Sequence, residues 1–152
     1  MSGRRRVLFL CTHNSARSQM AEGWLRRLGG DRFEAHSAGT EATAVRPLAI
    51  RAMAEVGVDI AGQESKRLER YLGQPWDWVV TVCDHANEAC PVFPGARRRL
   101  HWSLPDPSKA TGTEEEQLAA YRRVRDELRA RIAAFVAGAS GGGSPAPASR
   151  RG

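Results

Sequence analysis

Apolar positions along the chain alternate between short continuous runs and stripes at helical spacing. Residues 7–10 (Val-Leu-Phe-Leu) form one such run, as expected of a strand that is buried on both faces. Residues 16–28 then carry apolar side chains three and four positions apart, and Gly29 and Gly30 end this predicted helix. The same patterns predict further strands at 33–37, 78–82 and 99–102, and further helices at 45–56 and from residue 113 onward.

Alternating strands and helices predict an α/β fold: a single-domain, three-layer α/β/α arrangement around a four-stranded parallel sheet. We place this domain at residues 1–138. Its last helix opens with Thr113 and Glu116 at the spacing of a capping box. Residues 139–152 are rich in glycine, serine, proline and alanine. They offer too little apolar surface to become ordered, so we expect a flexible tail there.

The net charge of +6, from 23 basic and 17 acidic residues, at first suggests a nucleic-acid partner. Five of the basic residues lie at the chain ends: Arg4, Arg5, Arg6, Arg150 and Arg151. Without them, 18 basic residues face 17 acidic ones. The domain is therefore close to neutral and carries no nucleic-acid-binding motif, so we expect no nucleic-acid partner. Three consecutive arginines, residues 97–99, are expected on a solvated face.

No apolar run reaches the roughly 18 residues that a membrane span requires. The apolar run behind the first arginines is also too short for a secretory signal. We therefore expect a cytoplasmic protein with no membrane partner, whose three cysteines are reduced at rest.

The loop after the first predicted strand carries the pattern Cys, five residues, Arg, Ser. A loop between a strand and the start of a helix directs backbone N–H groups at one point and binds tetrahedral oxyanions there. The guanidinium of an arginine can hold two oxygens of such an anion. We assign anion binding to Thr12, His13, Asn14, Ser15, Ala16, Arg17 and Ser18.

The same positive field favours a thiolate at Cys11, which makes this residue the candidate nucleophile. Ser18 is expected to donate a hydrogen bond to the thiolate, and Asn14, a residue type that tolerates left-handed backbone conformations, is expected to brace the loop. Asp106, between Pro105 and Pro107, is the candidate general acid, with a raised pKa near the thiolate. The plainer alternatives are a buried cysteine at a strand end and an ordinary aspartate in a turn.

Two more cysteines, Cys83 and Cys90, follow the strand predicted at 78–82. Their spacing does not suit a zinc site, so no metal is expected. Cys83 lies at the carboxyl edge of the sheet, as Cys11 does, and is a plausible resolving thiol. If residues 84–89 are helical, the two α-carbons lie roughly 10 Å apart, and a disulfide requires about 7 Å or less. The pair would then join only after this segment unwinds; two unrelated thiols remain the alternative.

Taken together, these residues resemble the thioredoxin-coupled arsenate reductases, which share the low-molecular-weight tyrosine phosphatase fold. The resemblance covers residues 7 to about 136 and rests on these segments: 11–24, 37–39, 79–83, 89–91, 101–102, 106–107 and 112–116. The phosphatase-like loop is common to both families, whereas the pair Cys83 and Cys90 favours the reductase.

The resemblance implies a three-cysteine relay for arsenic detoxification. Cys11 attacks arsenate held by the loop and Arg17, and Asp106 protonates the departing oxygen. Cys83 then resolves the adduct and releases arsenite, and Cys90 completes the relay by pairing with Cys83. Thioredoxin supplies the reducing equivalents, and no further cofactor is required. We expect a monomer. The alternative is a phosphatase that hydrolyses aryl phosphates through a phospho-enzyme at Cys11, with no aromatic residue beside Asp106 to favour it.

The sequence departs from the relatives at three positions. Ala16 replaces a cysteine found in some of them, which removes a competing thiol. His13 stands where glycine is usual, beside the anion. Some relatives bind potassium through positions that match Asn14, Glu22, Ser37 and an acid at position 66. Here position 66 is Lys66, and we expect its ammonium to pair with Glu22 in place of the ion.

Overall fold

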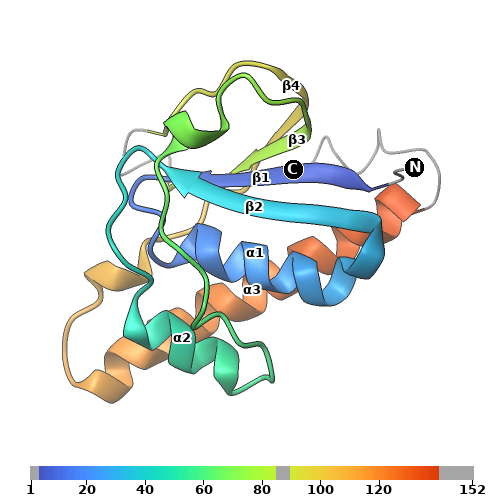
Figure 1. The fold of residues 1–152 in the computed structure, drawn as a ribbon. Coiled ribbons are helices and arrows are strands. Elements are labelled where there is room, and N and C mark those ends of the chain that lie inside the picture. The colour runs from blue at the N-terminus through green and yellow to red at the C-terminus, as the bar shows by residue number, and fades with distance from the viewer. Residues whose placement is uncertain (1–3, 85–89, 141–152) are drawn as a thin grey trace.

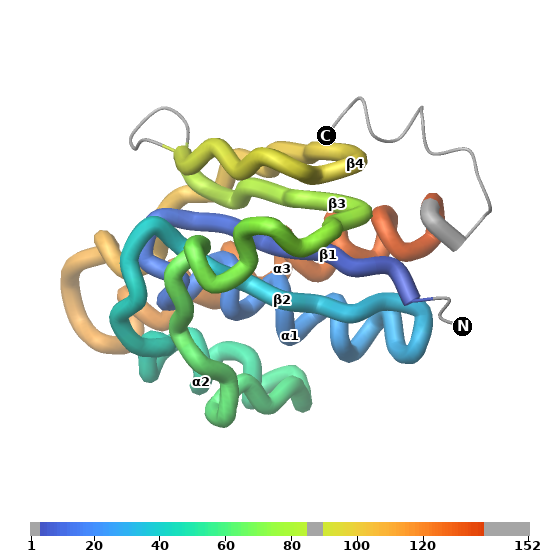
Figure 2. Tube along the Cα trace, turned by 45° about the horizontal axis from the view of Figure 1, so that its top comes forward, coloured from blue at the N-terminus to red at the C-terminus, as the bar shows by residue number. Residues whose placement is uncertain are grey.

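A computed structural model describes residues 4–84 and 90–140 of the 152-residue chain. Four parallel strands form one sheet in the order β2-β1-β3-β4 (Figures 1 and 2). Their bounds are β1 Arg5–Cys11, β2 Phe33–Gly39, β3 Trp76–Thr81 and β4 Ala96–His101. All four predicted strands are confirmed, with ends that shift by at most three residues. The continuous apolar run of β1 lies at the centre of the sheet, where both faces are covered.

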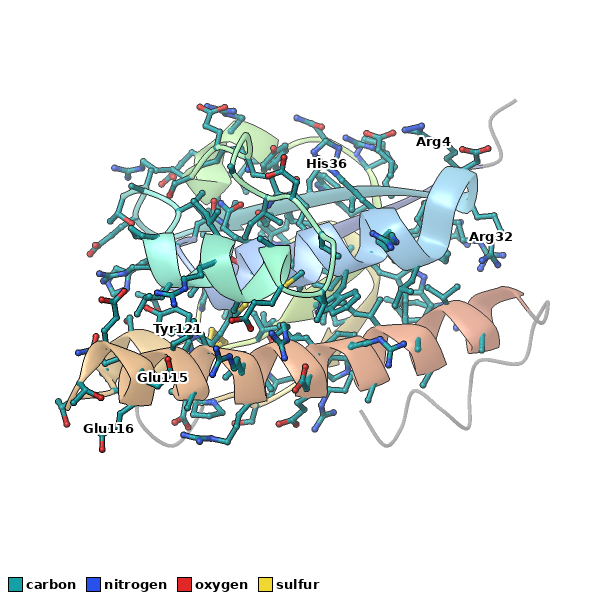
Figure 3. All side chains as sticks on the ribbon, turned by 90° about the horizontal axis from the view of Figure 1, so that it is seen from below. Arg4, Arg32, His36, Glu115, Glu116 and Tyr121 are labelled. Carbon is teal, nitrogen blue, oxygen red and sulfur yellow. A yellow bond between two sulfur atoms is a disulfide. The ribbon has the colours of Figure 1, made fainter. Side chains whose placement is uncertain are left out.

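Three α-helices cover one face of the sheet: α1 Arg17–Gly29, α2 Pro47–Ala54 and α3 Glu114–Ser140 (Figures 1 and 3). The helix predicted at 45–56 is shorter in the structure. Arg46 has an extended backbone conformation, with φ −67° and ψ 135°, and Pro47 occupies the first helical turn. A residue before proline disfavours the helical region, so the helix begins only at the proline.

The opposite face of the sheet is covered by a short 3-10 helix, η2 Leu68–Tyr71, and by extended chain. Side chains of β1 alternate between the two faces, with Val7 and Phe9 toward the α-helices and Leu8 and Leu10 toward η2. The predicted four-stranded α/β fold is therefore confirmed. Within the described residues, its second outer layer is built from η2 and loops rather than from an α-helix.

The start of α3 forms the predicted capping box. The Thr113 backbone N–H donates to Glu116 at 2.7 Å, and the Thr113 hydroxyl accepts from the Glu116 backbone at 3.1 Å. Figure 3 shows the helix lying along the molecule from Glu115 and Glu116 at its start. It ends at Ser140, so residues 139 and 140, predicted to open the flexible tail, belong to the helix instead; residues 141–152 of the predicted tail lie outside the described residues. None of the described helices is long and apolar enough to cross a membrane.

The arginine run lies on the edge strand β4 and is exposed, as predicted. Arg98 lies over the ring of Trp78, 5.4 Å from its centroid, and Arg99 donates to the carbonyl of Phe93 at 3.0 Å. These charges line an open sheet edge and oppose its pairing with another strand.

Candidate active site

The candidate site lies at the carboxyl edge of the sheet, in the loop that joins β1 to α1. Cys11 is the last residue of β1 and is 1% exposed, and Arg17 begins α1. Asn14 has a left-handed conformation, with φ 49°, which asparagine tolerates, and is the one described residue other than glycine with a positive φ. The chain therefore reverses tightly between the buried strand and the helix N-terminus.

The peptide carbonyls of this loop are held on its outer side. The Thr12 carbonyl accepts from the Glu41 backbone at 3.0 Å, and the Ser15 carbonyl accepts from the Arg46 backbone at 2.9 Å. The His13 carbonyl accepts from the hydroxyls of Thr43 and Ser65, each at 3.4 Å. In a planar trans peptide the N–H points away from the carbonyl, so the N–H groups of residues 13, 14 and 16 face the opposite side. That arrangement, next to a helix N-terminus, suits a tetrahedral oxyanion.

A directed pair of hydrogen bonds reaches the sulfur of Cys11. The Asn14 side-chain amide donates to the Ser18 hydroxyl oxygen at 2.8 Å, and that oxygen lies 2.9 Å from Cys11 Sγ. Since the Ser18 oxygen already accepts a proton from Asn14, its own hydrogen is free to be donated to the sulfur. The contact predicted between Ser18 and the sulfur of Cys11 is therefore present.

Arg17 and Asp106 form a buried ion pair beside the loop. Their side chains are 3% and 9% exposed, and Arg17 Nη2 lies 3.7 Å from Asp106 Oδ2. Arg17 Nη1 also donates to the Leu104 carbonyl at 3.1 Å. Although Asp106 is distant from the loop in the sequence, the structure brings this candidate general acid next to the anion loop. The guanidinium of Arg17 holds the Asp106 carboxylate there.

The predicted rise in the pKa of Asp106 is wrong for the protein without an anion. Burial pushes this pKa up, but hydrogen bonds from Ser108 and the charge of Arg17 together hold it below the usual 3.8. The Ser108 backbone and hydroxyl donate to Asp106 at 2.9 and 2.7 Å. A bound oxyanion adds negative charge and competes for Arg17, and both effects raise the pKa of Asp106. The acid form is thus expected only with an anion bound.

Replacing Asp106 by asparagine should reveal its contribution to stability and its contribution to turnover in two separate measurements. Because its folded-state pKa lies below 3.8, ionised Asp106 stabilises the fold above about pH 4 and loses this contribution as the pH falls further. Asp106→Asn should therefore lower the free energy of unfolding at pH 7 but much less at pH 3, as measured by urea titration. Turnover should fall about 100-fold, the usual effect of losing a general acid, while anion binding persists. Asp59→Asn, in an exposed turn, is the control; equal turnover in both variants would remove Asp106 from the mechanism.

Cys83 and Cys90 form a disulfide in the structure, with their α-carbons 5.7 Å apart. The expectation of three reduced cysteines is therefore not met, because this pair is oxidised and Cys11 alone is free. Cys83 is fully buried, whereas Cys90 is partly exposed. Of the helix considered over residues 84–89, residues 85–89 lie outside the described residues.

The disulfide lies at the same sheet edge as the anion loop. The Val82 backbone N–H donates to the Leu10 carbonyl at 2.9 Å, so the residues before Cys83 and before Cys11 lie side by side. Cys11 and Cys83 belong to one buried core cluster under the helices, and Cys90 packs against it. The sequence-based placement of Cys83 near Cys11 agrees with this arrangement.

The side chain of His13 is partly exposed and lies next to Glu41. Its Nε2 lies 3.5 Å from Glu41 Oε1, and its side chain is 40% exposed. The imidazole of His13 is therefore solvent-accessible and adjacent to the carboxylate of Glu41.

Two residues that support the loop were not identified from the sequence. Gln19 is fully buried, and its amide donates to the Asn14 carbonyl, to Asn14 Oδ1 and to the Glu64 carbonyl at 2.9–3.1 Å. Gly39, the last residue of β2, packs directly against the loop backbone. Gln19 is a polar residue in the first turns of α1, which are buried on almost every side. That unusual placement of a polar side chain is the signal that could have identified it.

Comparisons with known proteins agree with this geometry. Residues 6–140 match the model of the family described as low molecular weight phosphotyrosine protein phosphatase. An arsenate reductase of Halalkalibacterium halodurans is 50% identical over 130 residues, which cover 86% of this chain and 94% of that protein. A solved arsenate reductase in the phosphate binding state has a TM-score of 0.75 at 34% identity, over 88% of this chain and 97% of that one.

A thioredoxin-dependent arsenate reductase of Corynebacterium glutamicum is more distant, with a TM-score of 0.57 at 29% identity, over 86% of this chain and 63% of that one. The family match spans nearly all the described residues. The Halalkalibacterium halodurans relative is similar over most of the length of both chains. The chain therefore belongs to the low molecular weight phosphotyrosine protein phosphatase family, in the group that includes these arsenate reductases.

Proposed function

We propose that this protein is an arsenate reductase that works through a three-cysteine thiol–disulfide relay. The observation that carries the proposal is a disulfide, Cys83–Cys90, beside an anion loop that holds a free buried cysteine. A phosphatase needs only the loop and its nucleophile. A second pair of cysteines at the same sheet edge is required only when electrons are transferred.

In the first step, the thiolate of Cys11 attacks arsenate held by the loop amides and Arg17. A sulfur–arsenic bond forms and one arsenic–oxygen bond breaks, with Asp106 protonating the departing oxygen so that it leaves as water. Arsenic stays in its +5 state. The hydrogen bond from Ser18 holds the attacking sulfur at the base of the loop.

In the second step, the thiolate of Cys83 attacks the sulfur of Cys11. A disulfide forms between the two, and the sulfur–arsenic bond breaks with its electron pair left on arsenic, which leaves as arsenite. The thiolate of Cys90 then attacks Cys83 and releases Cys11 as a thiolate. The end product is an oxidised Cys83–Cys90 pair and a free Cys11, which is the oxidation state of the structure.

Regeneration requires a dithiol donor, and we propose thioredoxin, acting in the cytoplasm on a monomer. The partial exposure of Cys90 gives an external thiolate one sulfur to attack. The named activity of the Corynebacterium glutamicum neighbour supports the same class of donor. The relay needs no additional cofactor, since both electrons come from thiols.

The test is NADPH consumption with arsenate, thioredoxin and thioredoxin reductase, alongside hydrolysis of p-nitrophenyl phosphate. We expect arsenate-dependent NADPH loss in wild type, at most weak phosphatase turnover, and neither activity in Cys11→Ser. Brisk phosphatase turnover without arsenate-dependent NADPH loss would instead favour an aryl phosphatase, the function that the shared loop also permits.

A further inference from the structure

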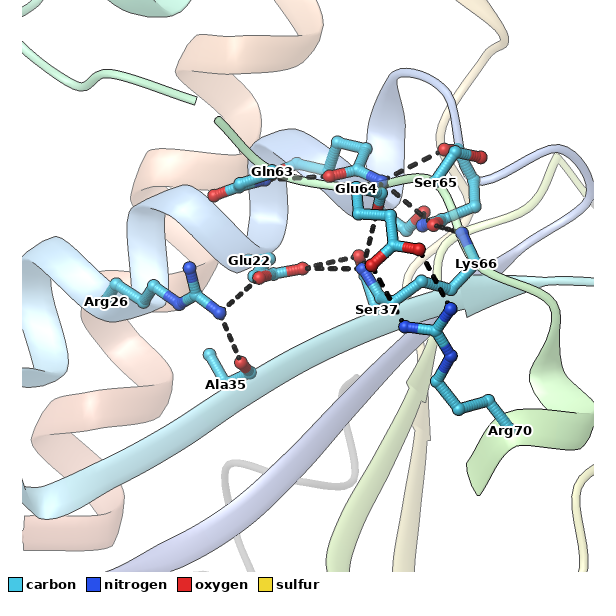
Figure 4. Close-up of polar contacts among 12 residues, drawn as sticks. Glu22, Arg26, Ala35, Ser37, Gln63, Glu64, Ser65, Lys66 and Arg70 are labelled. Carbon is cyan, nitrogen blue, oxygen red and sulfur yellow. Dashed lines mark hydrogen bonds and ion pairs between the residues drawn. The ribbon is translucent and has the colours of Figure 1, made fainter. Parts of the chain in front are cut away.

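A buried polar network lies beneath the anion loop, between α1, the end of β2 and residues 63–66 (Figure 4). At its centre, Lys66 Nζ donates to the Glu64 carbonyl at 2.5 Å and lies 3.7 Å from Glu22 Oε1. The side chains of Lys66 and Glu22 are 7% and 3% exposed. The predicted pairing of these two residues is therefore present in the structure.

Glu22 is a buried carboxylate that needs positive charge and donors around it. The Ser37 hydroxyl donates to Glu22 Oε1 at 2.6 Å, and Arg26 pairs with Glu22 Oε2 from the solvent side at 2.5 Å. On the inner side, the ammonium of Lys66 lies next to Glu22. Burial lowers the pKa of Lys66, and the charges of Glu22 and Glu64 oppose this. Removing one member of such a buried pair leaves the other uncompensated.

These residues do not fit a potassium site of the kind that some relatives have. Such a site needs oxygen ligands that converge on an ion, whereas here an ammonium occupies the space beside Glu22. The same residue also reaches the loop, because the Lys66 backbone N–H donates to Asn14 Oδ1 at 2.7 Å. This bond orients the Asn14 amide so that its Nδ2 faces Ser18, and Ser18 in turn faces the sulfur of Cys11.

We propose that Lys66 is a positioning residue for the anion loop, whose ammonium acts as a built-in monovalent cation and makes the site independent of dissolved potassium. The ammonium anchors residues 64–66 on Glu22, and the backbone of that segment fixes Asn14 and hence the hydrogen bond to the nucleophile. The inference rests on the proposed function only in naming arsenate as the anion, and it is tested by binding as well as by turnover.

Two variants separate the charge of Lys66 from the space that it fills. Lys66→Ala removes the ammonium and leaves a void, whereas Lys66→Met removes the charge and keeps the void filled. Arg67→Ala, at the adjacent position and in an exposed pair with Glu69, is the matched control. Arsenate affinity is measured by calorimetry in the Cys11→Ser background, which prevents covalent chemistry, and KM and kcat are measured with Cys11 present.

We expect both Lys66 variants to bind arsenate at least tenfold more weakly, with a larger change in KM than in kcat, and Arg67→Ala to match the wild type. Ammonium chloride or potassium chloride at about 0.1 M should restore arsenate binding to Lys66→Ala. This concentration is close to physiological ionic strength. Neither salt should restore binding to Lys66→Met, and choline chloride should restore it to neither variant. The wild type should respond equally to all three salts.

The proposal is overturned if wild-type binding rises severalfold with potassium, if Lys66→Ala binds arsenate normally, or if no cation restores it. Should Lys66→Ala fail to fold, the double variant Lys66→Met, Glu22→Gln removes both charges together. We expect it to fold and still bind arsenate more weakly; wild-type affinity there would also overturn the proposal. A wild type that binds arsenate but does not reduce it would contradict the proposed function and leave this test intact.

Discussion

Reduced Cys90→Ser protein should release one equivalent of arsenite from arsenate and then stop. Cys83 can still attack the Cys11 adduct, but no thiol remains to free Cys11 from the resulting disulfide. Cys11 and Cys83 are 1% and 0% exposed, so an external dithiol reaches this disulfide poorly. Steady-state turnover with thioredoxin should therefore fall at least 100-fold, even though the first turnover is intact.

Cys83→Ser should behave differently, because it removes the thiol that breaks the sulfur–arsenic bond. We expect no arsenite in a single turnover and an arsenic adduct that stays on Cys11. Quantifying arsenite and mapping alkylated cysteines by mass spectrometry distinguishes the three proteins. After one turnover, wild type should have a free Cys11, Cys90→Ser a disulfide at Cys11, and Cys83→Ser a blocked Cys11 without a disulfide. Multiple turnovers in either serine variant would contradict the relay.

The chemistry-bearing loop could be predicted because its signals are local. A continuous apolar run, a Cys-x5-Arg-Ser segment and a helical stripe occur within the first 28 residues, and the structure places them as β1, the loop and α1. The left-handed Asn14 and the hydrogen bond between Ser18 and Cys11 follow from the same short segment. Here the sequence spacing nearly determines the geometry.

The parts that were not predicted depend on contacts between distant segments. The sign of the pKa shift of Asp106 depends on Ser108 and on Arg17, a residue far away in the chain. The support of the loop by Gln19 and Lys66 depends on where residues 63–66 cross the end of β2. No local sequence pattern indicates either of these long-range arrangements. The oxidation state of Cys83 and Cys90 is likewise independent of their spacing.

The charge surplus illustrates the same difference of scale. The excess of basic residues suggested a polyanion, yet its internal run, residues 97–99, lines a sheet edge. The arginine that faces the candidate chemistry, Arg17, is buried and paired with Asp106. A small tetrahedral anion is selected by one oriented guanidinium and a few amides, to which net charge contributes little.

Gly39 is the residue outside the loop whose substitution should disturb the loop most. It ends β2 in register with Cys11, and its backbone N–H donates to the Lys66 carbonyl at 2.9 Å. A Cβ at this position would lie 2.7 Å from the Thr12 carbonyl oxygen and 2.8 Å from the Asn14 nitrogen. Both are backbone atoms of the loop, so no side-chain rotation relieves the contact.

Gly39→Ala should therefore push the loop out of its anion-binding shape. Overpacking of this kind typically costs about 1–3 kcal/mol in the free energy of unfolding. Arsenate affinity, measured by calorimetry on the Cys11→Ser background, should fall at least tenfold, because the amides of residues 13 and 14 move together with the displaced backbone. Gly62→Ala is the matched control, since a Cβ there meets no atom within 4 Å and the glycine has no positive φ. Its stability should stay within about 0.5 kcal/mol of the wild type. If Gly39→Ala also bound arsenate like the wild type, the close approach of β2 would not be what fixes the shape of the loop.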